Sequence, residues 1–188
     1  GRVVTNGMSQ YSRNERNANA GIVVGIEPGD YPTGGDRMRE TLGPDAVLRS
    51  APGEVHPLAG IVLQRELESD AYVLGGSNYH APGQLVGDYI ADRASTALGT
   101  VEPSYRPGVA LGHLGKALPA YAIDAIREAL PVFGRKIKGF DMPDAVLTGV
   151  ETRTSSPLRI ARGDDFQSLH VAGLFPAGEG AGYAGGIL

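Results

Sequence analysis

The sequence predicts an α+β fold, because helix-like patterns lie in its middle and strand-like stretches lie towards its two ends. Apolar residues recur at helical spacing between residues 57 and 130, whereas short apolar runs bounded by turn residues occur near residue 21 and after residue 145. Glycine (28 residues) and proline (13 residues) are spread along the chain, which favours many tight connections between short elements. This order differs from the regular alternation of a βαβ fold.

The first half of the chain predicts one strand and one clear helix. Residues 21–26, GIVVGI, form an apolar run between turn residues, as a buried strand does, and EPGDYPTGGD after it has the composition of a loop. Apolar residues at helical intervals then predict a helix over 57–74, with Pro57 in its first turn and glycines after its end. Residues 83–94, GQLVGDYIADRA, are a weaker helix candidate.

The second half predicts a helix followed by three strands. Residues 118–130, LPAYAIDAIREAL, carry one apolar stripe, and Pro131 should end or kink this helix. The strands are expected at 145–150 (AVLTGV), 157–162 (PLRIAR) and 168–175 (SLHVAGLF), with RGDD as a turn between the last two.

Composition excludes several classes of function. The net charge of −4 argues against a basic nucleic-acid-binding surface, and no apolar run approaches the roughly 20 residues that span a bilayer. The absence of cysteine excludes disulfides, thiolate metal ligands and cysteine nucleophiles. The four histidines lack metal-ligand spacing, so no metal is expected. A cytoplasmic protein without nucleic-acid or membrane partners is the expectation.

The last 16 residues, GLFPAGEGAGYAGGIL, run from a strand-like stretch into a glycine-rich loop. Such a loop offers unhindered backbone N–H groups, which suit a phosphate or the carbonyl edge of a flavin, and Glu179 could accept a hydrogen bond from a sugar or ribityl hydroxyl. The same glycines also fit a flexible end or close packing of strand and helix. Spacing alone leaves both interpretations open.

A polar cluster lies at residues 149–160, GVETRTSSPLRI. Arg153 could bind an anionic group as a two-pronged donor, although a polar turn satisfied by Ser and Thr hydroxyls explains the same residues. In GGSNYHAPGQ, the polar side chains Asn78, Tyr79, His80 and Gln84 could face a substrate or simply belong to a polar loop. No catalytic base is identifiable; Glu151 and His80 are candidates by chemistry alone.

Two long motifs, AVLTGVETRTSSPLRI and GLFPAGEGAGYAGGI, resemble the C-terminal region of a family of bacterial FAD-dependent dehydrogenases of uncertain substrate, also described as NAD(FAD)-utilising dehydrogenases. The resemblance extends upstream through VTNGMSQYSRNERNANAGIVV, RELESDAYVLGGSNYHAPGQLVGDY and PSYRPGV. It covers most of the chain, and the stretch EPGDYPTGGDRMRETLGPDAVLRSAPG is its least familiar part.

The resemblance implies a domain inserted on the substrate side over residues 1–144. Residues 145–188 would then return to a Rossmann-like FAD domain as its strand and glycine loop. The residues it places beside the flavin are Ala177, Gly178, Glu179, Gly180, Gly182, Gly185 and Gly186, and those on the flavin or substrate side are Arg153, Thr154, Ser155 and Ser156. The dinucleotide fingerprint of a complete member is missing, and so is the helix that should follow Gly186.

These features predict a fragment of a FAD-dependent oxidoreductase that is inactive alone and binds FAD weakly or not at all. The expected partners of the parent protein are the missing FAD-binding portion of its own chain and a small-molecule substrate, with NAD(P)H as a further candidate. The alternative is an autonomous, non-catalytic domain that binds a partner protein or a small anion through its glycine loop.

Overall fold

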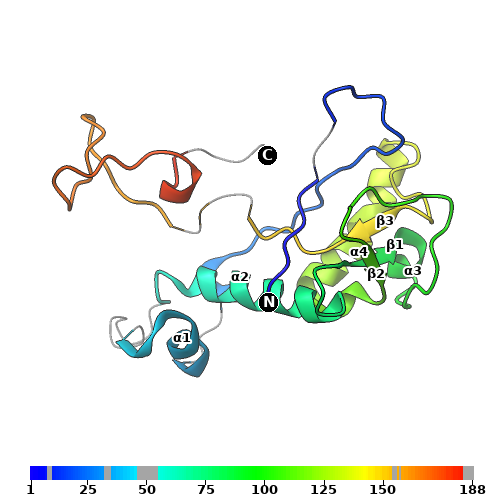
Figure 1. The fold of residues 1–188 in the computed structure, drawn as a ribbon, viewed down its shortest axis with the longest axis horizontal. Helices are drawn as coiled ribbons and strands as arrows, with labels where there is room; N and C mark the ends of the chain where they lie inside the picture. Colours follow the sequence, from blue (N-terminus) through cyan, green and yellow to red (C-terminus); the bar gives the residue numbers. More distant parts are fainter. Residues whose placement is uncertain (8–9, 32–34, 46–54, 154–155, 157, 184–188) are drawn as a thin grey trace. The chain divides into compact units, whose positions relative to one another are not determined.

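The computed structural model describes residues 1–7, 10–31, 35–45, 55–153, 156 and 158–183, and the chain divides into two compact units. The first unit comprises Gly1–Gly25 and Glu66–Glu151, and the second comprises Ile26–Arg65 and Thr152–Leu188 (Figure 1). Each unit has its own buried apolar cluster. The division at residue 144 concerns the domains of the full-length protein and stays a prediction.

The first unit contains a small mixed sheet of β1 (Ala81–Leu85), β2 (Val109–Leu111) and β3 (Val146–Thr148). Its order is β2-β1-β3, with β1 parallel to β2 and antiparallel to β3. Gly83 lies at the centre of β1, opposite Leu111 on one side and Thr148 on the other. A side chain at this glycine would collide with Val109, so the close pairing of β1 and β2 requires glycine there.

Helices α3 (Val86–Ile90) and α4 (Ala120–Lys136) pack over the core of this unit. The helix predicted over residues 118–130 is confirmed as part of α4, but its expected apolar stripe is confirmed only in part. Ala122 and Leu130 of that stripe are buried, Ile126 and Ala129 are half-buried, and Ala125 is exposed. Ile123, which lies outside the expected stripe, is buried as well. Ile123 and Leu130 belong to a core cluster whose other buried members are Val86, Tyr89 and Leu114.

Of the two effects expected of Pro131, an end or a kink of the helix, the structure excludes the end. The helix continues to Lys136, and the backbone N–H of Ile137 donates to the Phe133 carbonyl over 2.7 Å. Proline removes one helical hydrogen bond, but tertiary packing can outweigh that loss. Here the Phe133 ring meets the Phe140 ring edge to face, with 5.3 Å between centroids, and this contact anchors the turn after the proline.

The helix predicted over 57–74 is confirmed as α2 (Ala59–Leu74). The part of α2 up to Arg65 belongs to the second unit, together with α1 (Gly35–Leu42), which the loop-like composition did not predict. Its core consists of Met38, Ala59 and Val62. Arg65 on α2 donates to the Thr41 carbonyl over 2.8 Å, which fixes the end of α1 to α2. Short 3-10 turns occur at Pro28–Asp30 (η1), Leu114–Lys116 (η3) and Glu179–Ala181 (η4).

Three of the four strands expected from the sequence are not formed. Residues 21–26 belong to no strand. Among the described residues of the stretches expected as strands at 157–162 and 168–175, the one isolated bridge joins Arg162 and Ser168, and Pro157 lies outside the described residues. The turn between them is confirmed by the Gly163 N–H donating to Gln167 over 2.9 Å. An apolar, β-branched run forms a strand only where a neighbouring strand accepts its hydrogen bonds.

The strand expected over 145–150 is confirmed in its centre as β3 (Val146–Thr148). In contrast, β1 was not predicted, because Pro82 and Gly83 give its sequence, APGQL, the composition of a loop. The helix candidate over 83–94 divides accordingly into the end of β1 and the short helix α3.

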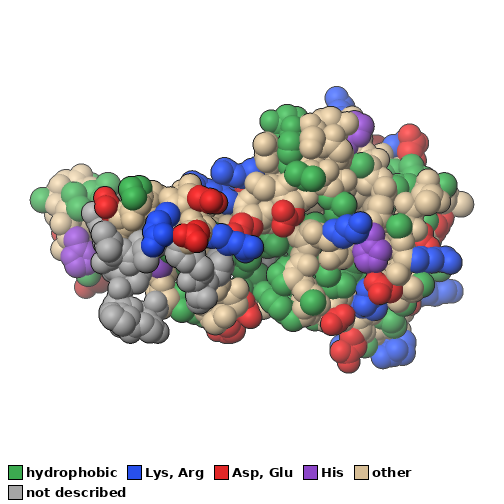
Figure 2. Space-filling view, turned by 90° about the horizontal axis from the view of Figure 1, so that it is seen from below, with side chains coloured by type: hydrophobic (Ala, Val, Ile, Leu, Met, Phe, Trp, Pro, Cys, Tyr) green, Lys and Arg blue, Asp and Glu red, His purple; other side chains and the backbone are tan. Residues whose placement is uncertain are grey.

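The α+β class is confirmed, whereas the Rossmann-like remnant stays a prediction. Within the part of the chain that the structure describes, no helix has the length and apolarity needed to cross a bilayer. Within each unit, Figure 2 shows both acidic and basic side chains among the described residues on the side in view.

Candidate cofactor-contacting loop

The glycine-rich loop of the second unit folds into a tight turn over residues 178–183. Gly178 and Gly182 have positive φ angles of 77° and 80°, which favour glycine at both ends of η4. The Gly182 N–H donates to Glu179 over 2.9 Å, and the Tyr183 N–H donates to Gly178 over 3.0 Å. The loop therefore has a defined conformation that depends on its glycines.

One side of this turn packs against residues 158–160. A Cβ atom at Gly182 would lie 2.8 Å from the Leu158 carbonyl oxygen. The Ile160 N–H donates to Ala181 over 3.2 Å, and the Tyr183 hydroxyl donates to the Ile160 carbonyl over 2.9 Å. At Gly182, close packing within the chain is thus the reason for glycine.

The other side of the turn is open. Ideal Cβ atoms at Gly178 and Gly180 have no described atom within 4 Å, and both residues are exposed. Pro176 and Ala181, which flank them, are buried. The turn therefore combines a packed side that fixes its shape with an exposed backbone that a ligand could approach.

Two arginines and a tyrosine lie at the base of the turn. The guanidinium carbon of Arg162 is 3.7 Å from the centroid of the Tyr183 ring, and that of Arg159 is 4.5 Å from the same centroid. Arg162 also lies 5.0 Å from the Phe166 ring and donates to the Pro176 carbonyl over 2.5 Å. These cation–π contacts hold positive charge next to the loop. This cluster was not predicted from the sequence, although Arg159 and Arg162 both lie in the expected strand PLRIAR.

Ser156 connects the polar cluster predicted from the sequence to the glycine loop. Its hydroxyl donates to the Gly180 carbonyl over 3.2 Å and lies 3.4 Å from the Leu158 N–H. Of the other predicted site residues, Ala177 and Glu179 are exposed on or beside the turn. The predicted residues Thr154, Ser155, Gly185 and Gly186 lie outside the described residues.

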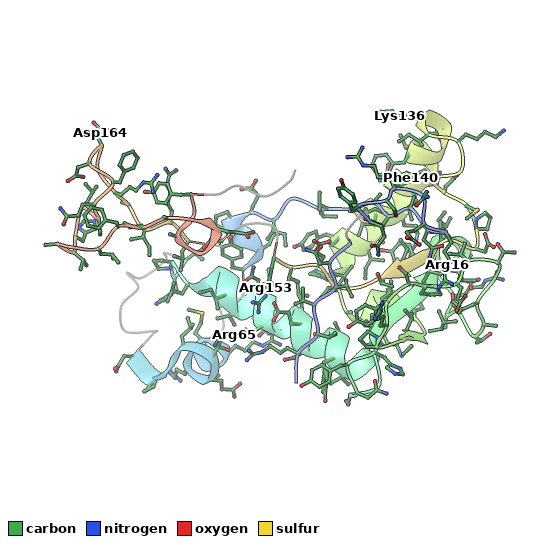
Figure 3. All side chains as sticks on the ribbon, turned by 45° about the horizontal axis from the view of Figure 1, so that its top comes forward. Arg16, Arg65, Lys136, Phe140, Arg153 and Asp164 are labelled. Atoms are coloured by element: carbon green, nitrogen blue, oxygen red, sulfur yellow. The ribbon has the colours of Figure 1, made fainter. Side chains whose placement is uncertain are left out.

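Arg153 lies near α2. The Gln64 side-chain amide donates to the Thr152 carbonyl over 2.7 Å, which holds the preceding residue against the helix. Figure 3 shows Arg153 beside the part of α2 that carries Arg65. The same view shows Asp164 at the tip of the turn over residues 163–167. Among the predicted polar residues, Ser156 is the one whose described hydrogen bond reaches the glycine loop, at Gly180.

The two candidate catalytic residues do not form a pair. No hydrogen bond or ion pair joins Glu151 to His80, both of which the structure describes. A Cβ at Gly108 would lie 3.1 Å from Nε2 of His80, so the imidazole ring packs against the backbone. Gln84 does not face a substrate: it is fully buried, its amide donates to Arg93 O over 2.6 Å, and it accepts from the Leu114 N–H over 2.8 Å.

A second polar cluster, also missed from the sequence, joins the turn after α3 to α4 in the first unit. Asp92 lies 2.6 Å from Arg127 Nη2 and 3.2 Å from His113 Nε2. Nδ1 of His113 accepts the Gly115 N–H over 3.1 Å, which places the proton of a neutral ring on Nε2, towards Asp92. Both ring nitrogens are therefore engaged, and the cluster has the geometry of a structural connection.

Comparisons with known proteins identify the family of the chain. The family model described as FAD-dependent protein, C-terminal domain-like matches residues 1–154. A protein of Clostridium beijerinckii, described as uncharacterised, is 45% identical over all 188 residues. The present chain spans only 31% of the length of that relative. The glycine loop lies beyond the stretch that the family model matches, but within the similarity to the relative.

Proposed function

The chain belongs to the family described as FAD-dependent protein, C-terminal domain-like, and from that premise we propose that its full-length protein is a FAD-dependent oxidoreductase. Residues 1–144 would form the substrate-side domain, and residues 145–188 would contribute to the flavin site. The substrate is a small molecule, and NAD(P)H is a candidate electron donor or acceptor.

The contact between Ser156 and Gly180 carries this proposal. It brings together the two motifs expected to lie at the flavin, which are 24 residues apart in the sequence. A glycine turn with no such contact would fit a simple chain end equally well. The bond fixes the orientation of the Gly180 carbonyl and leaves the opposite side of the turn exposed.

The exposed backbone of the turn fits the edge of a flavin or a ribityl chain. Ala177, Gly178, Glu179 and Gly180 would hold FAD at the open side, with Gly182 fixing the turn from behind. Gly185 and Gly186 complete the expected set. FAD, when bound, supplies hydride and electron transfer. The residues of this chain would bind and orient it and exclude water.

The segment before the turn supports a role within a larger sheet. Phe166, Leu169, Val171 and Phe175 are 61%, 64%, 53% and 62% exposed. Exposed apolar residues at this density are typical of a surface that another part of a protein covers. We expect the remaining portion of the full-length chain to cover them as these residues enter the FAD domain.

The experiment that tests the flavin site uses the full-length protein and the variant Gly180→Leu. A leucine at this position would occupy the open side of the turn without meeting a described atom. We expect wild-type protein to be yellow, with flavin absorbance near ~450 nm, and the variant to lose at least about tenfold in FAD affinity with an unchanged Tm of the apoprotein.

Gly29→Leu is the matched control, because Gly29 is also open and lacks a positive φ angle. It should retain FAD as the wild type does. A folded Gly180→Leu protein with normal FAD content would place the flavin elsewhere. A wild-type protein that is fully folded and takes up no added FAD would refute the proposal as a whole.

A second candidate function, binding of a small anion without catalysis, is favoured by the two guanidinium groups around Tyr183. Pyrophosphate would be the probe. If wild-type protein takes up no FAD but is stabilised by pyrophosphate, and Arg159→Gln removes that stabilisation, anion binding is the better description.

A further inference from the structure

Residues 21–25 of the first unit run straight but pair with no described strand. From Asn17 to Gly25 the chain contains no helix, turn or bend. Ile22 and Val24 are half-buried, whereas Val23 between them is 56% exposed. Alternating burial is the pattern of a β-strand with one face on a core. Residues 21–25 thus have the alternating burial of the predicted strand but no paired strand among the described residues.

The inner face of residues 21–25 contacts the core of the first unit. Ile22 packs against the buried core cluster of the first unit. Beside it, a partly open cavity of about 390 Å³ lies between residues 21–25 and one face of α4, where it is lined by Ala125, Ile126, Ala129 and Phe133. A strand placed next to residues 21–25 could cover this cavity with an inward-facing apolar side chain.

The backbone of the segment lacks partners within the described part of the chain. None of the backbone N–H or C=O groups of residues 21–25 hydrogen-bonds to another described backbone group. The surrounding stretch, residues 18–26, also contains no charged residue and no proline. Charges and prolines are the usual protection of a permanently exposed strand edge. An unprotected apolar edge is expected to have a partner.

The size of the relative indicates where that partner comes from. The present chain spans 31% of the relative's length, so about two thirds of that protein lies outside the matched region. A strand on the same polypeptide acts at an effective concentration in the millimolar range. A second copy of the protein would have to pair at its much lower bulk concentration.

We infer that residues 21–25 form a β-strand of the full-length protein by pairing with a strand from outside these 188 residues. This pairing joins the first unit directly to the rest of the protein and closes the cavity beside α4. The inference does not require the flavin to lie at the glycine loop, which belongs to the other unit.

Hydrogen exchange of the full-length protein tests the pairing. At least two amides from Ile22 to Gly25 should exchange more than about 100-fold slower than in an unstructured chain, because paired strand amides open rarely. This protection should persist after tenfold dilution of the protein, as expected from the intramolecular pairing. Exchange at the unstructured rate, or protection that dilution removes, would overturn the inference.

A photocross-linker identifies the partner strand. In the full-length protein, Val23→p-benzoylphenylalanine should give a cross-linked peptide from the same polypeptide but from outside residues 1–188. The control is the same replacement at Val73, which is 68% exposed on α2, where the helix already satisfies the backbone. A Val23 product within residues 1–188, from a second copy or from another protein, would overturn the inference, as would a yield no greater than that at Val73.

Discussion

The carbonyl oxygen of Leu158 occupies the space next to Gly182, so close that an added Cβ would lie 2.8 Å from it. Gly182 also has a φ of +80°. The two constraints are independent, because one is steric and the other concerns the backbone conformation. Together they make Gly182 the glycine of the turn that is most difficult to replace.

We therefore expect Gly182→Ala to open the turn, whereas Gly180→Ala should not. Forcing alanine into the left-handed region costs roughly 1–2 kcal/mol, and the contact with Leu158 adds to this cost. Hydrogen exchange of the apoprotein reports the effect at the amides of Ile160 and Tyr183, both of which bond across the turn. Equal exchange in the two variants would show that the turn does not depend on Gly182.

The role of Gly182 also illustrates what sequence reasoning could reach. The glycine pattern predicted a loop without deciding between a flexible end and a constrained turn, and the apolar pattern of residues 118–130 predicted α4, because both signals are local. The small sheet was harder to predict from the sequence. Pro82 and Gly83 give β1 the composition of a loop, and its partner strands come from distant parts of the chain. The arrangement of Arg159 and Arg162 around Tyr183 depends on tertiary contacts across 20 residues or more, and no local pattern encodes it.

Gln84 provides a test of the core of the first unit. Its buried amide joins Arg93 O to the Leu114 N–H, so it connects the loop after α3 with the start of η3. Gln84→Leu would leave the buried Leu114 N–H and the partly buried Arg93 carbonyl without their partner, at a cost of roughly 1–3 kcal/mol in the free energy of unfolding. Denaturant unfolding of the full-length protein measures this loss.

Gln10 is the matched control, because it is also a glutamine but is exposed. Gln10→Leu should change the free energy of unfolding by less than about 0.5 kcal/mol. If both substitutions had the same small effect, the buried amide of Gln84 would not contribute to stability in the way that its geometry indicates.

The carboxylate of Asp88 makes part of the free energy of unfolding dependent on pH in the acid range. The Ser95 hydroxyl and the Arg93 guanidinium, each 2.6 Å away, donate to its carboxylate and lower its pKa below the ordinary value of 3.8. A lowered folded-state pKa stabilises the folded protein above the unfolded pKa, and this contribution is lost as the pH falls through the folded pKa.

Ser95→Ala should raise the pKa of Asp88, because the hydroxyl is its strongest stabilising contact. Acid unfolding of the variant should then begin at a higher pH than that of the wild type, and an NMR titration of the Asp88 carboxyl carbon would measure the shift. Ser12→Ala, at an exposed serine, is the control. An unchanged Asp88 titration would contradict the assigned contact.

Tyr89 makes the free energy of unfolding dependent on pH in the alkaline range. Burial in the core raises the pKa of its hydroxyl to about 12, from the usual 10, although the nearby Arg127 partly opposes this change. The hydroxyl donates to the Ile123 carbonyl over 3.2 Å. Because the folded pKa is raised, the stabilisation is complete below pH 10 and is lost as the pH rises from about 10 to 12.

The difference in absorbance near ~295 nm between wild type and Tyr89→Phe isolates this single phenol during an alkaline titration. We expect its ionisation to coincide with alkaline unfolding, and we expect the variant to unfold at higher pH because it has no phenol to ionise. At neutral pH the same variant should lose only about 1 kcal/mol, the value of one hydrogen bond. A Tyr89 phenol that ionised near pH 10 in folded protein would contradict its burial in the core.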